Sequence, residues 1–343
     1  MALCESPVIF MLPKTGNNHP SFVYHTPAKL NLRLKITGLR EDGYHELVSI
    51  MVPVGLYDRI ELEPVTENAA RMHCNGFSVP DDESNLVFKA IRAFSSCTGM
   101  DQGFLIHLTK NIPVAAGLGG GSSDAACVLM ALNEMFSNPV SEEKLAQLAV
   151  GLGADVPFFL YGGPCLARGI GEILELIQEW PNLWYVVVMP PIAVSTAWVY
   201  TEFDKYHLRS TEKNTGELEL TKAQYPFIMP DFRGEKYQIE PLLENDLEKI
   251  TIPAFPVIDT IKTLLLQAGA GGALMSGSGP SVFGVFQSKE KCFQAKEFLQ
   301  ARNVGDVFAL EGLMGCRQAV RHGPLEPAFG GSNPPTPANE RTY

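Results

Sequence analysis

The chain has 343 residues, more than the ~250–300 at which a single hydrophobic core usually stops growing, which predicts about two domains. Its 45% apolar and 19% charged residues exclude a disordered or fibrous protein, and no apolar run approaches the ~20 residues of a membrane helix. The net charge of −11, without any block of Lys and Arg, predicts neither a nucleic-acid nor a membrane partner.

The two ends of the chain differ from its middle. Residues 1–21 lack the charge and apolar pattern of a signal peptide and are interpreted as a leader. Residues 322–343 are rich in Pro and Gly and are predicted to form a disordered tail. The seven cysteines are scattered and include no C-x-x-C pair, which favours reduced, buried thiols and a cytoplasmic location.

Strand and helix patterns alternate between these ends and predict an α+β fold. Strand patterns occupy residues 29–38, 59–65, 104–110, 165–169, 184–190 and 272–286. Helix patterns occupy residues 84–99, 122–136, 141–153, 195–206, 255–269 and 289–302. The polar stretch 207–238 is predicted to be an inserted loop, and a junction near 178–182 separates a domain at 22–178 from a domain at 179–321.

A glycine-rich loop precedes the second helix pattern, with the sequence PVAAGLGGGSS at residues 113–123. Glycines allow the backbone to wrap closely around an anion, and a helix start offers unpaired N–H donors, so the loop fits a nucleotide phosphate. The alternative is a flexible loop ahead of a core helix. The loop lacks the Lys of a Walker A motif and the third Gly of a dinucleotide fingerprint, so it belongs to neither class.

Three stretches in chain order resemble the motifs of the GHMP kinases. PVAAGLGGGSS is similar to the second motif of that family, GGALMSGSGPSVFGVF at 271–286 to the third, and TPAKLNLRLKITGLREDGYHELVSIM at 26–51 to the first. DGYHE, GLGADVPFFLYGG at 151–163 and ENDLE at 244–248 resemble the branch of the family that phosphorylates a cytidyl diphosphate sugar-alcohol. The resemblance covers residues from about 24 to 321.

This resemblance implies a two-domain fold with the active site in the cleft between an N-terminal, nucleotide-binding domain and a C-terminal domain. It implies an ATP-dependent kinase that phosphorylates the 2-hydroxyl of 4-diphosphocytidyl-2-C-methyl-D-erythritol, in non-mevalonate isoprenoid precursor biosynthesis. The partner expected is thus a small molecule. The alternatives are another GHMP kinase, acting on homoserine or mevalonate, and a catalytically silent nucleotide-binding regulator. The motifs assign no oligomeric state.

Two residues take catalytic roles by the same resemblance. Asp155, in GADVPFF, matches the catalytic base of the family, and Lys29, in PAKLN, matches the lysine that pairs with it. Without the resemblance, Asp155 fits the cap of a short helix and Lys29 fits a charged residue that protects an edge strand.

The nucleotide side is expected to use the glycine-rich loop with Mg²⁺, for which Ser123 is a candidate ligand although the motifs assign no metal site. A branched side chain at Gly119 is expected to occupy the space of the phosphates. The third motif brings Gly277, Ser278 and Gly279 close to the phosphates. The expected ATP-binding residues are Asn85, Lys110, Pro113, Val114, Ala115, Ala116, Gly117, Leu118, Gly119, Gly120, Gly121, Ser122 and Ser123.

The acceptor side is expected to hold the cytosine by stacking and hydrogen bonding. Tyr44 and Tyr200 supply aromatic faces, although Phe is common at the second position in the family, and His45 supplies a hydrogen bond. Read alone, DGYH fits a turn with an exposed His45. The expected acceptor-binding residues are Asn31, Tyr44, His45, Asp155, Thr196 and Tyr200.

Overall fold

The structure is a computed structural model that describes residues 22–67, 69–213 and 239–314. The predicted leader and tail, and residues 214–238 of the predicted insertion, lie outside the described residues.

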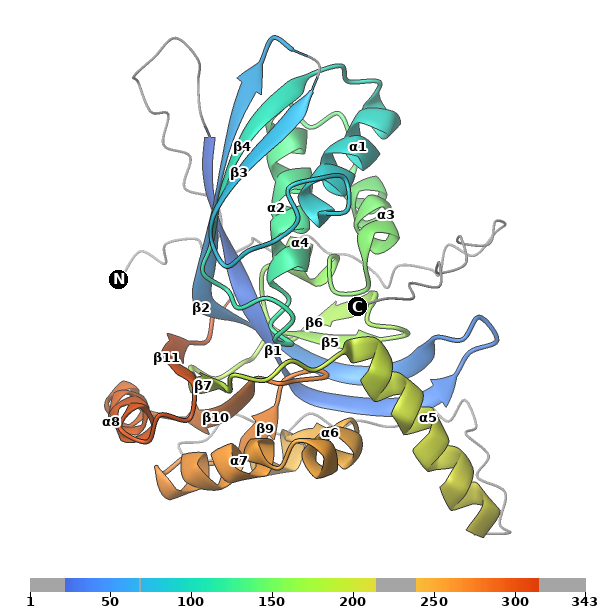
Figure 1. Ribbon diagram of the computed structural model, residues 1–343. Coiled ribbons are helices and arrows are strands. Elements are labelled where there is room, and N and C mark those ends of the chain that lie inside the picture. Colours follow the sequence, from blue (N-terminus) through green and yellow to red (C-terminus); the bar gives the residue numbers. More distant parts are fainter. Residues whose placement is uncertain (1–21, 68, 214–238, 315–343) are drawn as a thin grey trace.

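A larger sheet of seven strands forms the first layer of the molecule (Figure 1). Its strand order is β3-β4-β2-β1-β8, with β5 paired to β2 and β6 paired to β5. The long antiparallel ribbon of β1 and β2 is its centre. The strands are β1 (Phe22–Leu39), β2 (His45–Val65), β3 (Ala70–Gly76), β4 (Gly103–Lys110), β5 (Cys165–Arg168), β6 (Ile173–Leu176) and β8 (Glu244–Asn245).

A second, antiparallel sheet has the order β11-β7-β10-β9. Alternate residues of β7 face opposite layers, since Tyr185 and Val187 pack toward the first sheet while Val186 and Val188 pack toward helices. Because β8 comes from the second half of the chain but pairs with β1, the two halves share a sheet. The strands are β7 (Trp184–Met189), β9 (Ala273–Met275), β10 (Val282–Phe286) and β11 (Asp306–Glu311).

The helices cover the outer faces of both sheets, so that three apolar layers alternate with the sheets. Those of the first half pack on the first sheet and are α1 (Leu86–Thr98), α2 (Gly120–Met135), α3 (Glu142–Leu152) and α4 (Phe158–Tyr161). In the second half, α7 (Val257–Gln267) and α8 (Lys289–Gln300) pack on the second sheet, α6 (Glu248–Ala254) packs beside α7, and α5 (Thr196–Lys213) packs against α6, with a short 3₁₀ turn at Glu240–Leu242. In the described part of the chain no single helix is long and apolar enough to span a membrane; only the bent α6–α7 pair, at 104°, passes that test when joined.

All six predicted helices are confirmed, and each predicted strand overlaps an observed one, although the stretch 272–286 forms two strands, β9 and β10. The prediction of an inserted loop from residue 207 is wrong at its start, because α5 continues to Lys213. The first half of β2 was missed, since a strand paired on both sides is apolar throughout rather than alternating, and Pro53 and Gly55 interrupt its pattern. The short strands β3, β6 and β11 had too little pattern to be recognised. The domain junction stays a prediction.

Candidate active site

The glycine-rich loop connects β4 to α2, and its backbone takes positive φ angles that glycine adopts without strain. Gly117 and Gly119 have φ of 76° and 71°, and Ala115 also has a positive φ, of 52°. Gly119 is the N-cap of α2 and has no side chain to satisfy the first N–H groups of the helix. The start of α2 therefore presents unpaired donors and the positive end of the helix dipole, as expected of an anion site.

Three consecutive carbonyl groups of the loop accept hydrogen bonds from the rest of the protein. The Leu118 oxygen accepts from the backbone N–H of Lys29 at 2.9 Å, and the Gly117 oxygen from the Ser276 hydroxyl at 2.9 Å. The Ala116 oxygen accepts from the Ser281 N–H at 3.3 Å. Because these oxygens are held by protein groups, the loop is docked onto β1 and onto the turn between β9 and β10.

The loop glycines also mark where protein atoms approach closely. A Cβ at Gly117 would lie 2.2 Å from the Ser276 carbonyl oxygen, so the second and third motifs touch through the backbone. A Cβ at Gly119 would lie 2.9 Å from Lys29 Cγ and 3.1 Å from Phe159 Cζ. A side chain at Gly119 would therefore first displace Lys29, and the expectation that it would also occupy the space of the phosphates stays a prediction.

Lys29 and Asp155 meet beside this loop. Lys29 Nζ lies 3.3 Å from Asp155 Oδ2, and the lysine side chain is 4% exposed whereas that of the aspartate is 38% exposed. Register shifts at Pro27/Ala28 and Asn31/Arg33 flank the lysine and free its N–H for the loop. A buried cation thus points to a carboxylate that faces the solvent, where a substrate hydroxyl can reach it.

Asn31 and the third motif complete the same corner. Asn31 Oδ1 accepts a hydrogen bond from Lys29 Nζ at 2.5 Å, and its backbone N–H donates to the Ser276 hydroxyl at 3.3 Å. Asn245 Nδ2, in the ENDLE stretch, donates to the carbonyl oxygens of Met275 and Gly277 at 2.8 and 2.7 Å. The glycine-rich turn is thereby held against β1 and the catalytic pair.

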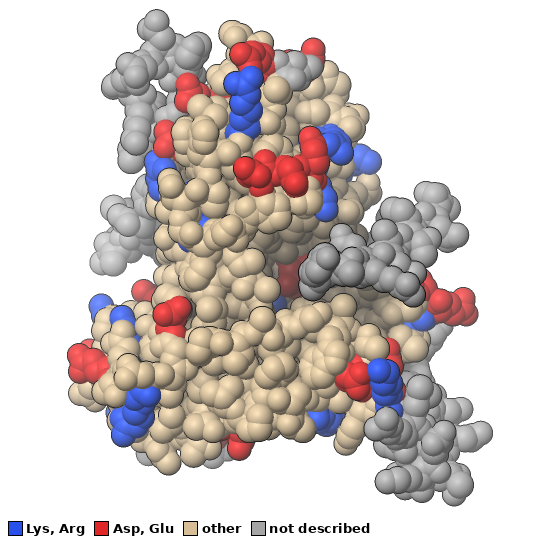
Figure 2. Space-filling model, in the orientation of Figure 1, with Lys and Arg blue, Asp and Glu red and all other residues tan. Residues whose placement is uncertain are grey.

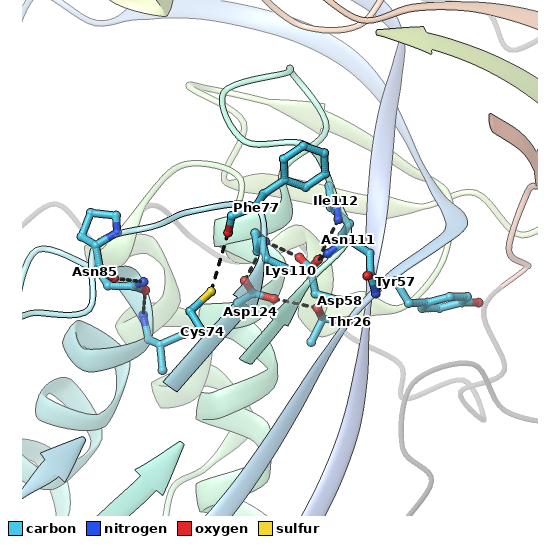
Figure 3. A network of polar contacts seen from close by, with 12 residues as sticks. Thr26, Tyr57, Asp58, Cys74, Phe77, Asn85, Lys110, Asn111, Ile112 and Asp124 are labelled. Atoms are coloured by element: carbon cyan, nitrogen blue, oxygen red, sulfur yellow. Dashed lines mark hydrogen bonds and ion pairs between the residues drawn. The ribbon is translucent and has the colours of Figure 1, made fainter. Parts of the chain in front are cut away.

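A network of buried charges lies under the loop (Figure 3). Lys110 Nζ is paired with Asp58 and, at 2.8 Å, with Asp124 Oδ2. Asp58 Oδ1 also accepts the backbone N–H groups of Asn111 and Ile112 at 2.6 and 2.8 Å, where the chain leaves β4 for the loop. The network joins the start of the loop to the first turns of α2 and fixes both ends of the loop.

The side chains of Asn85 and Lys110, two of the expected ATP-binding residues, both have partners within the protein. The Lys110 ammonium lies between two buried carboxylates and faces away from the solvent. The Asn85 side chain caps α1 by accepting from the Val87 N–H at 2.9 Å and donates to the Pro80 oxygen at 2.7 Å. The structure thus gives both side chains protein partners, and their contact with a nucleotide stays a prediction.

The Asp124 carboxyl makes the stability of this network depend on pH. Burial raises its pKa from about 3.8 to about 6, against the opposing effect of Lys110 and with a further increase from Asp58. A raised folded-state pKa stabilises the protein at low pH, and this contribution is lost as pH rises through about 6. Asp124→Asn removes the titration. The free energy of unfolding of the variant, relative to wild type, should therefore rise between about pH 4 and pH 6, as measured by urea unfolding.

Asp259→Asn, at an exposed site on α7, is the control for the chemistry of the substitution. A difference between Asp124→Asn and wild type that stays constant over this pH range would contradict a titrating Asp124.

Three of the residues expected on the acceptor side lie on α5 and at the start of β2. Thr196 Oγ1 lies 2.7 Å from Ser278 Oγ of the third motif. One turn further along α5, the Tyr200 ring packs on His45 with centroids 5.0 Å apart. Burial, with the nearby Asp155 charge as a second cause, raises the pKa of Tyr200 to about 12. The structure thus brings Thr196, Tyr200 and His45 to the same corner as the catalytic pair.

Tyr44 stands apart from this group. Its side chain is 52% exposed, and it makes no ring contact within the described residues. It follows Gly43, whose φ of 84° bends the chain between β1 and β2, so the simple turn interpretation holds for the backbone. His45, in contrast, is not a surface residue, because its side chain is only 9% exposed.

The residues described offer no group of three or more His, Cys, Asp or Glu that would hold a metal. The Ser123 hydroxyl, in the first turn of α2, is buried and has no hydrogen-bond partner among the described residues. An unpartnered hydroxyl beside a phosphate loop, without a cage of carboxylates, fits Mg²⁺ held mainly by phosphate oxygens and water.

Several residues of the site were not predicted from sequence. Asp58, Asp124, Asp204 and Ser276 reach it through strand pairing and helix packing between distant segments. Asp124 did carry a signal, as the only charge in the small and apolar first half of α2. Asp204 lies four residues after Tyr200 and hence on the same face of α5.

The chain matches known protein families over most of its length. The family profile described as GHMP kinases N terminal domain matches residues 85–163, and the profile described as GHMP kinases C terminal matches residues 232–305. The chain is 46% identical over 285 residues to the 4-diphosphocytidyl-2-C-methyl-D-erythritol kinase of Syntrophotalea carbinolica, covering 83% of this chain and 96% of the relative. It is 44% identical over 277 residues to the protein of the same name from Geobacter sulfurreducens, covering 81% of this chain and 94% of the relative.

The chain is also similar in fold to solved structures of GHMP kinases. A crystal structure of a 4-(cytidine 5'-diphospho)-2C-methyl-D-erythritol kinase superposes with a TM-score of 0.66 at 34% identity, covering 86% of this chain and 100% of that one. A homoserine kinase from Cytophaga hutchinsonii has a TM-score of 0.62 at 22% identity over 89% of this chain and 98% of its own, which supports the shared fold alone.

Proposed function

Because the chain belongs to the 4-diphosphocytidyl-2-C-methyl-D-erythritol kinase family of the GHMP kinases, we propose that it transfers the γ-phosphate of ATP to the 2-hydroxyl of 4-diphosphocytidyl-2-C-methyl-D-erythritol. The observation that carries the proposal is the Lys29–Asp155 pair at 3.3 Å, held against the glycine-rich loop by the bond from the Lys29 N–H to the Leu118 oxygen. ATP and acceptor would then meet where the pair faces the solvent. On the face shown in Figure 2, the molecule is hollowed between the half with α1–α4 and the half with α5–α7.

Phosphoryl transfer depends mainly on positioning the hydroxyl and on supplying charge where charge develops. Asp155 orients the 2-hydroxyl and accepts its proton. Lys29 holds the carboxylate in place and lends its positive charge to the attacking oxygen. The first N–H groups of α2 and the Gly277–Gly279 turn hold the phosphates from the two sides of the site.

Magnesium ion, when bound with ATP, neutralises charge on the phosphate oxygens. Ser123 is the residue of the loop that would reach it, with water and phosphate oxygens as the remaining ligands.

The cytidyl group of the acceptor lies along α5 in this proposal. Tyr200 offers an aromatic face, and His45 offers a ring nitrogen to the polar edge of the base. Asn31 and Thr196 contribute polar groups nearer the phosphates. Tyr44, being exposed on the β1–β2 turn, would cover the outer side of the base.

An ADP-release assay on the purified full-length protein tests this function. With ATP held constant, the acceptors are the cytidyl substrate, homoserine and mevalonate. We expect kcat/KM for the cytidyl substrate to exceed that for either small alcohol by at least about 10³-fold, because only the cytidyl substrate has a base to fill the α5 corner. Equal or greater activity with a small alcohol would overturn the proposed acceptor, and no activity with any of the three would favour a silent regulator.

A further inference from the structure

His45 is held from several sides at the start of β2. Its Nε2 lies 2.7 Å from Asp204 Oδ1, and its ring packs on Tyr200 and, edge-on at 6.1 Å between centroids, on Phe203. All three partners come from α5. The imidazole therefore has one orientation, whereas Asp204 itself is 43% exposed and reaches inward from the surface of the helix.

The chemistry of the partner decides which ring nitrogen carries the proton. An ionised carboxylate only accepts hydrogen bonds, so the contact with Asp204 requires a hydrogen on His45 Nε2. In the neutral imidazole the other nitrogen, Nδ1, is then an acceptor. Among the described residues, His45 Nδ1 makes no hydrogen bond, and it is therefore available to a ligand.

The position of Asp204 on α5 ties it to the acceptor site rather than to the general surface. Thr196, Tyr200 and Asp204 follow one another at spacings of four and share a face of the helix. Thr196 contacts Ser278 of the third motif, Tyr200 lies near Asp155, and Asp204 contacts His45. One helix face thus runs from the phosphate turn to the imidazole.

From these contacts we propose that Asp204 is a specificity-determining positioning residue, which fixes His45 as the Nε2–H tautomer so that Nδ1 accepts a hydrogen bond from an amino group of the acceptor base. The inference rests on the proposed function, in which that base is a cytosine. Cytosine presents a 4-amino donor where uracil presents a carbonyl oxygen, and an acceptor nitrogen facing a carbonyl oxygen makes no hydrogen bond and is repelled. Asp204 would therefore act on the choice between cytidyl and uridyl diphosphate acceptors without contacting either.

Asp204→Asn is the decisive variant. An amide presents either its oxygen or its NH₂ group to His45 Nε2, so it no longer specifies the tautomer. We expect the ratio of kcat/KM for the cytidyl substrate to kcat/KM for its uridyl analogue to fall by about tenfold or more, with the KM for ATP unchanged. Asp204→Glu, which keeps a carboxylate, should restore most of the ratio. Glu202→Gln, on the same helix and paired with Lys205 instead, is the matched control.

A spectroscopic readout separates this role from a merely structural one. In ¹⁵N-labelled full-length protein, the two ring nitrogens of a neutral histidine differ in chemical shift according to which carries the proton. Wild type should show His45 protonated at Nε2 only, and Asp204→Asn should show a mixture of tautomers. A variant that loses activity equally on both substrates while the tautomer stays unchanged would overturn the inference, as would a wild-type His45 protonated at Nδ1.

The proposed function and the role of Asp204 can be overturned separately. If wild type does not phosphorylate the cytidyl substrate, the proposed function fails. If wild type prefers the cytidyl substrate and Asp204→Asn keeps that preference in full, the function stands and the role of Asp204 is wrong.

Discussion

Replacing Lys29 with Ala, or Asp155 with Asn, should lower kcat by roughly 10²–10⁴-fold while the KM values for ATP and acceptor change only modestly. The two groups lie 3.3 Å apart and, in the proposed function, act on the same hydroxyl. Loss of the lysine leaves the carboxylate without its orienting charge, and loss of the carboxylate leaves a buried lysine with nothing to position. The double variant should therefore lose far less than the product of the two single losses.

Steady-state kinetics of wild type, the two single variants and the double variant test this prediction. Lys205→Ala, which removes an exposed ammonium group on α5, is the control for loss of a positive charge and should keep wild-type kcat. Full additivity of the two single effects would show that Lys29 and Asp155 do not work as a unit.

Gly117→Ala should cost at least about 10²-fold in kcat/KM and lower the melting temperature, because the new methyl group has no room. Its Cβ would lie 2.2 Å from the Ser276 carbonyl oxygen, and the φ of 76° at this position is unfavourable for any residue with a side chain. The loop and the β9–β10 turn would have to separate, which breaks the bond from the Ser276 hydroxyl to the Gly117 oxygen.

Gly119→Ala should affect kinetics differently from Gly117→Ala. Its Cβ meets the flexible Lys29 side chain at 2.9 Å, so kcat should fall more than the KM for ATP rises. Gly151→Ala, in α3 with no atom within 4 Å of the new Cβ, is the control and should leave both kinetics and melting temperature near wild type. A Gly117→Ala protein with wild-type activity would show that close contact between the two motifs is not needed.

The features predicted best from sequence are those that depend only on neighbouring residues. The glycine spacing at 117, 119, 120 and 121 correctly predicts positive φ and the start of a helix, since both are local properties. The two proposed catalytic residues required more, because neither Lys29 in a strand nor Asp155 in a turn differs locally from an ordinary charged residue. Only the resemblance to a family selected them.

What the sequence did not reveal depends on contacts between distant segments. Asp58 binds the loop through residues more than fifty positions away, and Asp204 meets His45 across 159 positions. The two carboxylate partners of Lys110 were missed for the same reason, since they come from β2 and α2. Local patterns carry no information on such pairs, whose energies become available only when the sheet and helices have packed.

The central claim is that phosphate goes from ATP to the 2-hydroxyl of the cytidyl substrate, and ³¹P NMR of the purified product tests it most directly. Carbon 2 of the methylerythritol unit carries a methyl group and no hydrogen. A phosphate on its oxygen should therefore give a new phosphomonoester signal without three-bond coupling to any proton, formed together with an equal amount of ADP. A new signal split by one or two protons would place the phosphate on a neighbouring hydroxyl and would contradict the account.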